Sequence, residues 1–160
     1  MIIQPGDKIP ESMLYEMGDN GPEGYSTEEL FAGKTVVLFG LPGAYTPTCS
    51  AKHVPSYVEN AEKLREKGVD EVICMAVNDA FVMGAWGKDQ GVDDKVRMLA
   101  DGSAEFTKKL GLELDLTERG MGVRCDRFAM IVKDGVVQSI DLEAPGEFKV
   151  SDAETQLGKL

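Results

Sequence analysis

The chain has 160 residues, 42% of them hydrophobic and 28% charged, which is enough for one globular domain with a core of its own. Its net charge of −11 at pH 7 argues against nucleic-acid binding, which depends on neutralising phosphates with Lys and Arg. The sequence contains no run of 18 apolar residues, so no membrane span is predicted. The first residues lack the basic and apolar regions of a signal peptide, and we therefore expect a cytoplasmic protein.

The first third of the chain predicts a hairpin, a short helix and a buried strand. We expect residues 1–25 to form a short antiparallel hairpin, and a capping box at 26–29 to open a helix that ends at Phe31. The apolar run 36–39 predicts a buried strand. The stretch 40–49, rich in glycine and proline, leads from that strand into the next helix.

A long helix with a cysteine in its first turn follows. Thr46 stands at the N-cap and Pro47 at the first helical position, where its missing N–H costs nothing. Cys49 then faces unpaired backbone N–H groups and the positive end of the helix dipole, which both favour a thiolate. We interpret Cys49 as a reactive cysteine, the alternative being a small buried residue between helix and sheet. Pro55 should kink this helix, which Gly68 ends, so that the turn with Cys49 can melt separately.

The remaining residues predict strands that alternate with helices. We expect strands at 69–77 and 95–99, helices from 80 to 89 and from 104 to 110, and a hairpin of strands 127–132 and 136–142. The Asp134-Gly135 pair between the last two strands is a type I′ turn signal, and a second capping box at 151–154 predicts a terminal helix. This order indicates a single α/β domain over residues 1–160 with a mixed sheet.

The segment from Pro42 to Cys49 reads Pro-Gly-Ala-Tyr-Thr-Pro-Thr-Cys. It resembles the P-x-x-x-T-x-x-C signature of the peroxiredoxins, thiol-dependent peroxidases with a thioredoxin-like fold, a central mixed β-sheet flanked by helices. Other segments are similar to the type II, or peroxiredoxin-5-like, subfamily: Val77-Asn-Asp with Phe81-Val-Met and Ala85-Trp, Leu99-Ala-Asp-Gly, Gly111-Leu-Glu-Leu-Asp, and Arg124-x-x-Arg127-Phe. The similarity runs in register over nearly the whole chain.

The resemblance implies a peroxidase that reduces hydrogen peroxide and small alkyl hydroperoxides through a sulfenic acid at Cys49. Thr46 lies one turn before Cys49, so its hydroxyl would reach the sulfur and a bound peroxide, while Pro42 would shield the thiolate from water. Arg127 matches the family's cation beside the sulfur. The residues alone place Arg127 only at a strand start, where a surface charge is the alternative. We expect neither a cofactor nor a metal.

Cys74 matches the second cysteine of the type II peroxiredoxins that form an internal disulfide. It is therefore a candidate resolving cysteine, with a buried strand cysteine as the alternative. Residues 147–152, where the animal branch carries its resolving cysteine, contain none. The resemblance also implies a glutaredoxin/glutathione or thioredoxin system as reductant, and a homodimer. We interpret Cys125 as incidental and His53 as structural.

Three other functions would use the same residues. A cysteine hydrolase would pair Cys49 with His53, but no acidic residue is evident to orient that histidine. A structural zinc site would combine these two residues with Cys74 and Cys125, which are too dispersed for the usual paired spacing. A non-catalytic thiol redox sensor or chaperone would share the reactive cysteine, and catalytic turnover is what distinguishes it from the peroxidase.

Overall fold

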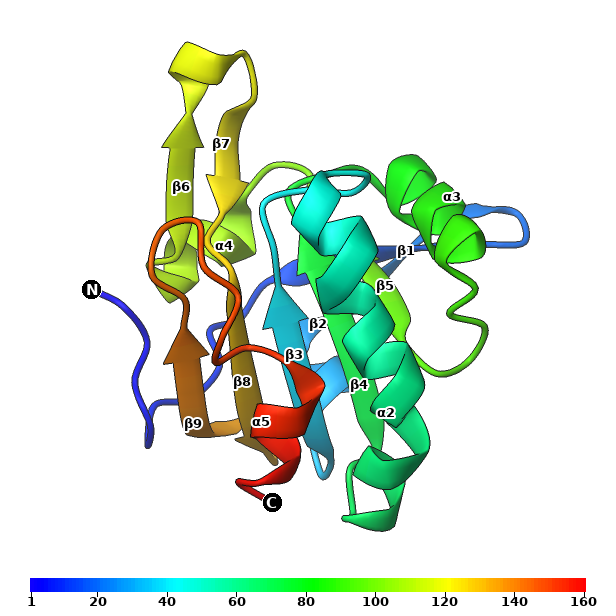
Figure 1. Ribbon diagram of the computed structural model, residues 1–160, viewed down its shortest axis with the longest axis vertical. Coiled ribbons are helices and arrows are strands. Elements are labelled where there is room, and N and C mark those ends of the chain that lie inside the picture. Colours follow the sequence, from blue (N-terminus) through cyan, green and yellow to red (C-terminus); the bar gives the residue numbers. More distant parts are fainter.

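The computed structural model describes all 160 residues and is built around one seven-stranded mixed sheet (Figure 1). The strands of this sheet are β1 (Met13–Gly18), β2 (Gly21–Ser26), β3 (Thr35–Gly40), β4 (Glu71–Ala76), β5 (Arg97–Ala100), β8 (Phe128–Lys133) and β9 (Val136–Leu142). Their order is β2-β1-β5-β4-β3-β8-β9, with β3, β4 and β5 parallel and the outer pairs antiparallel. This confirms the predicted α/β class with a mixed sheet.

Five α-helices cover the two faces of the sheet: α1 (Thr27–Phe31), α2 (Val54–Glu66), α3 (Ala80–Gln90), α4 (Glu105–Leu110) and α5 (Ala153–Leu157). Successive residues of β3 alternate between two hydrophobic cores, as side chains along a strand must. Val37 and Phe39 pack with side chains of α2, α3 and α5, the largest of which is Trp86 of α3. Val36 and Leu38 pack with α1 and α4 on the opposite face. Figure 1 shows α2 and α5 in front of the central strands.

Most of the predicted turns and caps are confirmed. The hairpin of β1 and β2 pairs from Met13 with Ser26 to Gly18 with Gly21, and Ser26 caps α1 in a complete capping box. Asp134 and Gly135 both have positive φ between β8 and β9, as a type I′ turn requires. None of the helices combines the length and the apolar character that crossing a bilayer would require.

The predicted capping box at 151–154 is wrong by one position. Asp152 caps α5, because its carboxylate accepts from the Thr155 backbone N–H at 3.2 Å. Ser151 instead donates its hydroxyl to Oε2 of Glu143 at 2.7 Å. A hydrogen bond to a charged carboxylate is about twice as strong as a neutral one. The Ser151 hydroxyl therefore binds Glu143 instead of capping the helix.

A small second sheet lies outside the predicted elements. It consists of β6 (Glu113–Leu116) and β7 (Gly122–Cys125), joined by a 3₁₀ turn at Thr117–Arg119, and Figure 1 shows it standing beyond one end of the main sheet. Its strands have four residues each and contain Glu113 and Asp115, which are poor strand formers. Strands this short and polar carry no clear two-residue hydrophobic pattern.

The long predicted helix begins at Pro47, but its first part is not regular. Residues Cys49–His53 form a π-helical segment in which the Val54 N–H donates to the Cys49 carbonyl, and α2 continues from Val54. Pro55 explains the irregularity, since its ring has no N–H to donate and conflicts with the carbonyl four residues earlier. A wider π turn relieves that conflict, and such turns are frequent at functional sites.

Candidate active site

Arg127 and Cys49 meet at one end of the sheet. Cys49 is fully buried in the first turn after the β3 loop, and Nη2 of Arg127 donates to its Sγ at 3.2 Å. β3 and β8 are antiparallel neighbours that pair Gly40 with Phe128, so the loop after β3 and the residue before β8 lie at the same end of the sheet. A guanidinium in hydrogen-bond contact with a sulfur stabilises the thiolate form. The structure thus brings together two predicted site residues that are 78 positions apart.

The loop with Pro42 is held from two sides. Arg124 of β7 donates from Nη1 to the Pro42 carbonyl at 3.2 Å and from Nε to the Met121 carbonyl at 2.9 Å. On the other side, the Ala44 N–H donates to Oδ1 of Asn78 at 2.9 Å. Pro42 is half-buried, and it lines a surface hollow together with Arg127. Sequence reasoning did not identify these roles of Arg124 and Asn78, although both residues fall in the segments that resemble the family.

Thr46 starts the helix with its backbone but not with its side chain. Its carbonyl accepts from the Ser50 N–H at 3.0 Å, as expected of an N-cap residue. Its hydroxyl donates to the Gly43 carbonyl at 2.8 Å, so the predicted side-chain cap is replaced by a bond that closes the preceding loop. A hydroxyl has one proton and two lone pairs. With its proton directed to Gly43, the Thr46 hydroxyl oxygen is left with the capacity to accept hydrogen bonds.

His53 contacts Arg127 rather than Cys49. Its Nδ1 lies 2.8 Å from Nη1 of Arg127, and its Nε2 lies 3.1 Å from the Ser151 carbonyl. A guanidinium only donates and a carbonyl only accepts, so both bonds require the neutral imidazole with the proton on Nε2. Burial, followed by the charge of Arg127, lowers the pKa of His53 to about 3. Neither ring nitrogen is free to serve a hydrolase as a base for Cys49.

The other two cysteines are buried thiols. Cys74 lies in β4 beside Phe39 of β3, in the same hydrophobic core as Cys49, and burial raises its pKa well above the ordinary value. Cys125 ends β7 and donates to the Asp126 carbonyl at 3.2 Å, and burial raises its pKa as well. All three cysteines are free, and no three His, Cys, Asp or Glu side chains converge as metal ligands.

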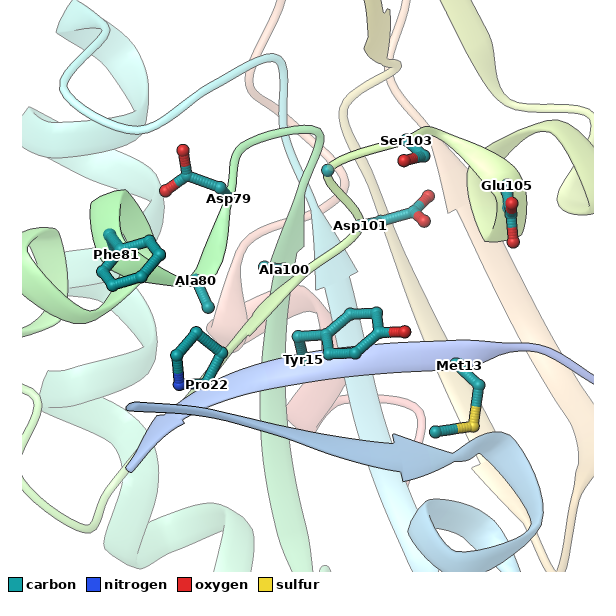
Figure 2. Close-up of a pocket in the computed structure, with 11 residues that line it drawn as sticks. Met13, Tyr15, Pro22, Asp79, Ala80, Phe81, Ala100, Asp101, Ser103 and Glu105 are labelled. Carbon is teal, nitrogen blue, oxygen red and sulfur yellow. The ribbon is translucent and has the colours of Figure 1, made fainter. Parts of the chain in front are cut away.

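Two surface hollows are large enough to admit a small substrate. A hollow of about 700 Å³ borders the site through Pro42, Thr48 and Arg127, with residues of the β6–β7 sheet and the segment after β9 as its other walls. A smaller hollow lies between the β1–β2 hairpin and the start of α3, where Figure 2 shows Tyr15 and Phe81 among its lining residues. Neither hollow is lined by a cysteine. The first is lined by Arg127, which contacts the Cys49 sulfur, whereas no basic residue lines the second.

Known proteins with similar sequences or structures cover almost the whole chain. A family model described as Redoxin matches residues 4–157. Peroxiredoxin-2B of Arabidopsis thaliana is 50% identical over 159 residues, which span 99% of this chain and 98% of the relative. Reduced Prx3 of Vibrio vulnificus in complex with H₂O₂ has a TM-score of 0.94 and 49% identity over 99% of both chains. A Burkholderia cenocepacia structure described as a putative thioredoxin reductase has a TM-score of 0.98 and 55% identity, over 100% of this chain and 99% of that one.

Proposed function

Since the chain belongs to the redoxin family and is a type II peroxiredoxin, a thiol-dependent peroxidase with a thioredoxin-like fold, we propose that Cys49 is the cysteine that attacks the peroxide. The observation that carries this proposal is the 3.2 Å contact between Nη2 of Arg127 and Sγ of Cys49. No Lys or Arg side chain hydrogen-bonds to the sulfur of Cys74 or Cys125, and burial raises the pKa of both.

The proposed reaction transfers one oxygen from the peroxide to sulfur. The Cys49 thiolate attacks the hydroxyl oxygen of the hydroperoxide, and a sulfur–oxygen bond forms as the oxygen–oxygen bond breaks. The sulfur loses two electrons and becomes a sulfenic acid, while the departing alkoxide or hydroxide takes up a proton to leave as alcohol or water. Arg127 donates to the negative charge as it moves from sulfur to oxygen. Thr46 accepts from the peroxide hydroxyl, and Pro42 keeps water from the sulfur.

Substrate access fits hydrogen peroxide and small alkyl hydroperoxides. Cys49 is fully buried, whereas Arg127 and Pro42 line the hollow of about 700 Å³ beside it. A peroxide therefore reaches the sulfur past the guanidinium, with any alkyl group left in the hollow. Leu114, Leu116 and Leu142 supply apolar surface there.

We further propose that Cys74 resolves the sulfenic acid. Its thiol would attack the Cys49 sulfur, form a disulfide and release water, and a glutaredoxin/glutathione or thioredoxin system would reduce that disulfide. Cys74 lies mid-strand, paired with Phe39 on one side and Met98 on the other, so it cannot move without disrupting the sheet. The π-helical turn that carries Cys49 is the segment that would have to unwind. If Cys74 is only a core residue, an external thiol attacks the sulfenic acid directly.

The proposal also includes a homodimer, one domain spanning residues 1–160, and a cytoplasmic location. Tyr45, on the loop before Cys49, and Phe81, in the first turn of α3, support the dimer, because these aromatic side chains are 52% and 61% exposed. Both hydrophobic cores share one sheet, which supports a single domain. Three free thiols suit a reducing compartment.

Steady-state peroxide consumption with each reductant supplied in turn tests the proposed function. Glutathione with glutaredoxin, thioredoxin with its reductase, and a small dithiol would be compared at equal peroxide. Turnover with at least one of them is expected for a peroxidase. A single round of oxidation without turnover under every reductant would instead support a thiol sensor or chaperone.

A further inference from the structure

Glu143 lies just beyond β9, and its carboxylate holds a turn of the chain together. Its Oε2 accepts from the backbone N–H of Val150 at 2.9 Å and from both the N–H and the hydroxyl of Ser151 at 2.7 Å. The Lys149 N–H donates to both carboxylate oxygens at 2.9 Å. Burial by itself would raise the pKa of Glu143, but the hydrogen bonds from Ser151, Lys149 and Val150 lower it. The carboxylate is therefore charged at neutral pH and fixes segment 149–151.

The Ser151 carbonyl in that segment faces the active site. It accepts from Nε2 of His53 at 3.1 Å and from the Tyr57 hydroxyl at 2.7 Å, and both donors are fully buried. Because the carbonyl can only accept, it places the imidazole proton on Nε2 and leaves the lone pair of Nδ1 for Arg127. The position of the Ser151 carbonyl thus determines that His53 presents an unprotonated Nδ1 to Arg127.

We propose that Glu143 is a positioning residue for the peroxidase reaction, acting through Ser151 and His53 to hold the Arg127 guanidinium at the Cys49 sulfur. The contacts form an unbroken series from the carboxylate to Sγ, and each bond is between 2.7 and 3.2 Å long. The inference rests on the proposed function, since it assumes that Arg127 and Cys49 carry the chemistry. Glu143 does not touch the sulfur and acts only on the arrangement of the groups that do.

The sign of the effect separates this role from simple electrostatics. A carboxylate beside a hollow disfavours a nearby thiolate, so removing its charge should shift thiol ionisation to lower pH. Releasing segment 149–151 should have the opposite effect, because His53 would lose its anchor and Arg127 would lose contact with the sulfur. Glu143→Gln keeps the shape of the side chain but replaces an anionic acceptor, which four donor groups contact, by a neutral amide.

Glu147→Gln provides the matched control. Glu147 lines the same hollow and carries the same charge, but its side chain is 45% exposed and only pairs with Lys149 at 3.5 Å. The ultraviolet absorbance of the Cys49 thiolate would be titrated in both variants, with the Cys49→Ser protein subtracted, and the rate of oxidation by hydrogen peroxide measured. We expect Glu143→Gln to shift the titration to higher pH and to slow oxidation roughly 2- to 30-fold. Glu147→Gln should slow oxidation much less than Glu143→Gln and shift the titration, if at all, to lower pH.

An identical response of the two variants would overturn the proposal. The same measurements in an Arg127→Met background supply a second test, because Glu143→Gln should then no longer shift the titration to higher pH and should show only the shift to lower pH that follows from the lost charge. An undiminished shift to higher pH in that background would also overturn the proposal. Fluorescence of Trp86, the only tryptophan, whose Nε1 donates to Ser50 beside Cys49, verifies that each variant is folded.

Two further variants keep the proposal testable if Glu143→Gln does not fold. His53→Asn retains an acceptor close to the position of Nδ1, whereas His53→Gln retains a donor close to that of Nε2. We expect the Asn variant to oxidise faster than the Gln variant, since contact with Arg127 is what matters for the sulfur. The reverse order would show that His53 only anchors segment 149–151. Peroxidase turnover that survives Cys49→Ser would refute the proposed function itself, separately from any result with Glu143.

Discussion

Arg127 joins Cys49 to His53, donating from Nη2 to the sulfur at 3.2 Å and from Nη1 toward Nδ1 of the imidazole at 2.8 Å. The two contacts use both terminal nitrogens of one planar group, so they fix its orientation as well as its position. The arginine is therefore held by a buried neutral histidine while it supplies charge at the sulfur.

Arg127→Lys is the first prediction, since it retains the charge and removes the planar fork. A single ammonium cannot make both contacts in the same geometry, so we expect slower oxidation by hydrogen peroxide. Arg127→Met should be slower still, on the order of 10²-fold below wild type, and should shift thiolate titration to higher pH. Stopped-flow oxidation and absorbance titration measure the two effects. An unchanged titration in Arg127→Met would place the arginine away from the sulfur in solution.

Thr46→Val should lower the rate while keeping the fold. The change removes the hydroxyl bond to the Gly43 carbonyl, worth about 0.5–1.5 kcal/mol, and the acceptor proposed for the peroxide. We expect a loss on the order of 10²-fold in the rate of Cys49 oxidation. Thr48→Val is the control, because Thr48 is half-buried in the same turn and makes no side-chain cap bond. Equal rates of Cys49 oxidation in the two variants would show that the Thr46 hydroxyl only stabilises the loop and takes no part in the reaction.

His53 should make the fold sensitive to mildly acidic pH. Its pKa is about 3 in the folded chain and about 6.5 when unfolded, so between these values the unfolded state binds more protons. Stability from this group is complete above pH 6.5 and falls with decreasing pH, by about 2 kcal/mol from pH 7 to pH 5. Denaturant unfolding of wild type and His53→Asn at both pH values isolates this contribution. The same pH dependence in both proteins would assign it to other groups.

Oxidation should join Cys49 to Cys74 only after local unwinding. Both thiols are fully buried, and a disulfide needs Cα atoms roughly 4.4–6.8 Å apart. Peroxide-treated protein digested without reductant should yield a peptide linking the two segments, and Trp86 fluorescence should change as Ser50 moves away. Cys125→Ser should behave as wild type. Normal turnover of Cys74→Ser with a glutathione or glutaredoxin system would make Cys74 a core residue.

Sequence patterns single out candidate site residues where these are contiguous in the chain. Pro42, Thr46 and Cys49 lie in one loop and helix start, so a strand, a glycine- and proline-rich stretch and a helical pattern were enough to single out the cysteine. Arg127 could be assigned only through the family resemblance, because it reaches the sulfur through the pairing of β3 with β8. No local pattern predicts which strands of a sheet become neighbours.

The features that sequence reasoning missed depend on contacts between distant residues. Ser151 followed by Glu154 has the spacing of a capping box, yet the serine hydroxyl is bound by Glu143, eight residues earlier. His53 is structural, as expected, but the spacing suggests Cys49 as its nearest partner, whereas its nitrogens bind Arg127 and the Ser151 carbonyl. In both cases a charged or buried partner from another element outweighs the local interaction that the spacing suggests.

The most direct test of the central claim is steady-state peroxide consumption by Cys49→Ser beside Cys125→Ser, each with the reductant that supports wild-type turnover. Both variants should retain the fold, since sulfur and oxygen differ little in size and both cysteines are buried without a disulfide. We predict that Cys125→Ser consumes peroxide at the wild-type rate and that Cys49→Ser consumes none above the uncatalysed background. Appreciable turnover by folded Cys49→Ser would show that another residue carries out the reaction.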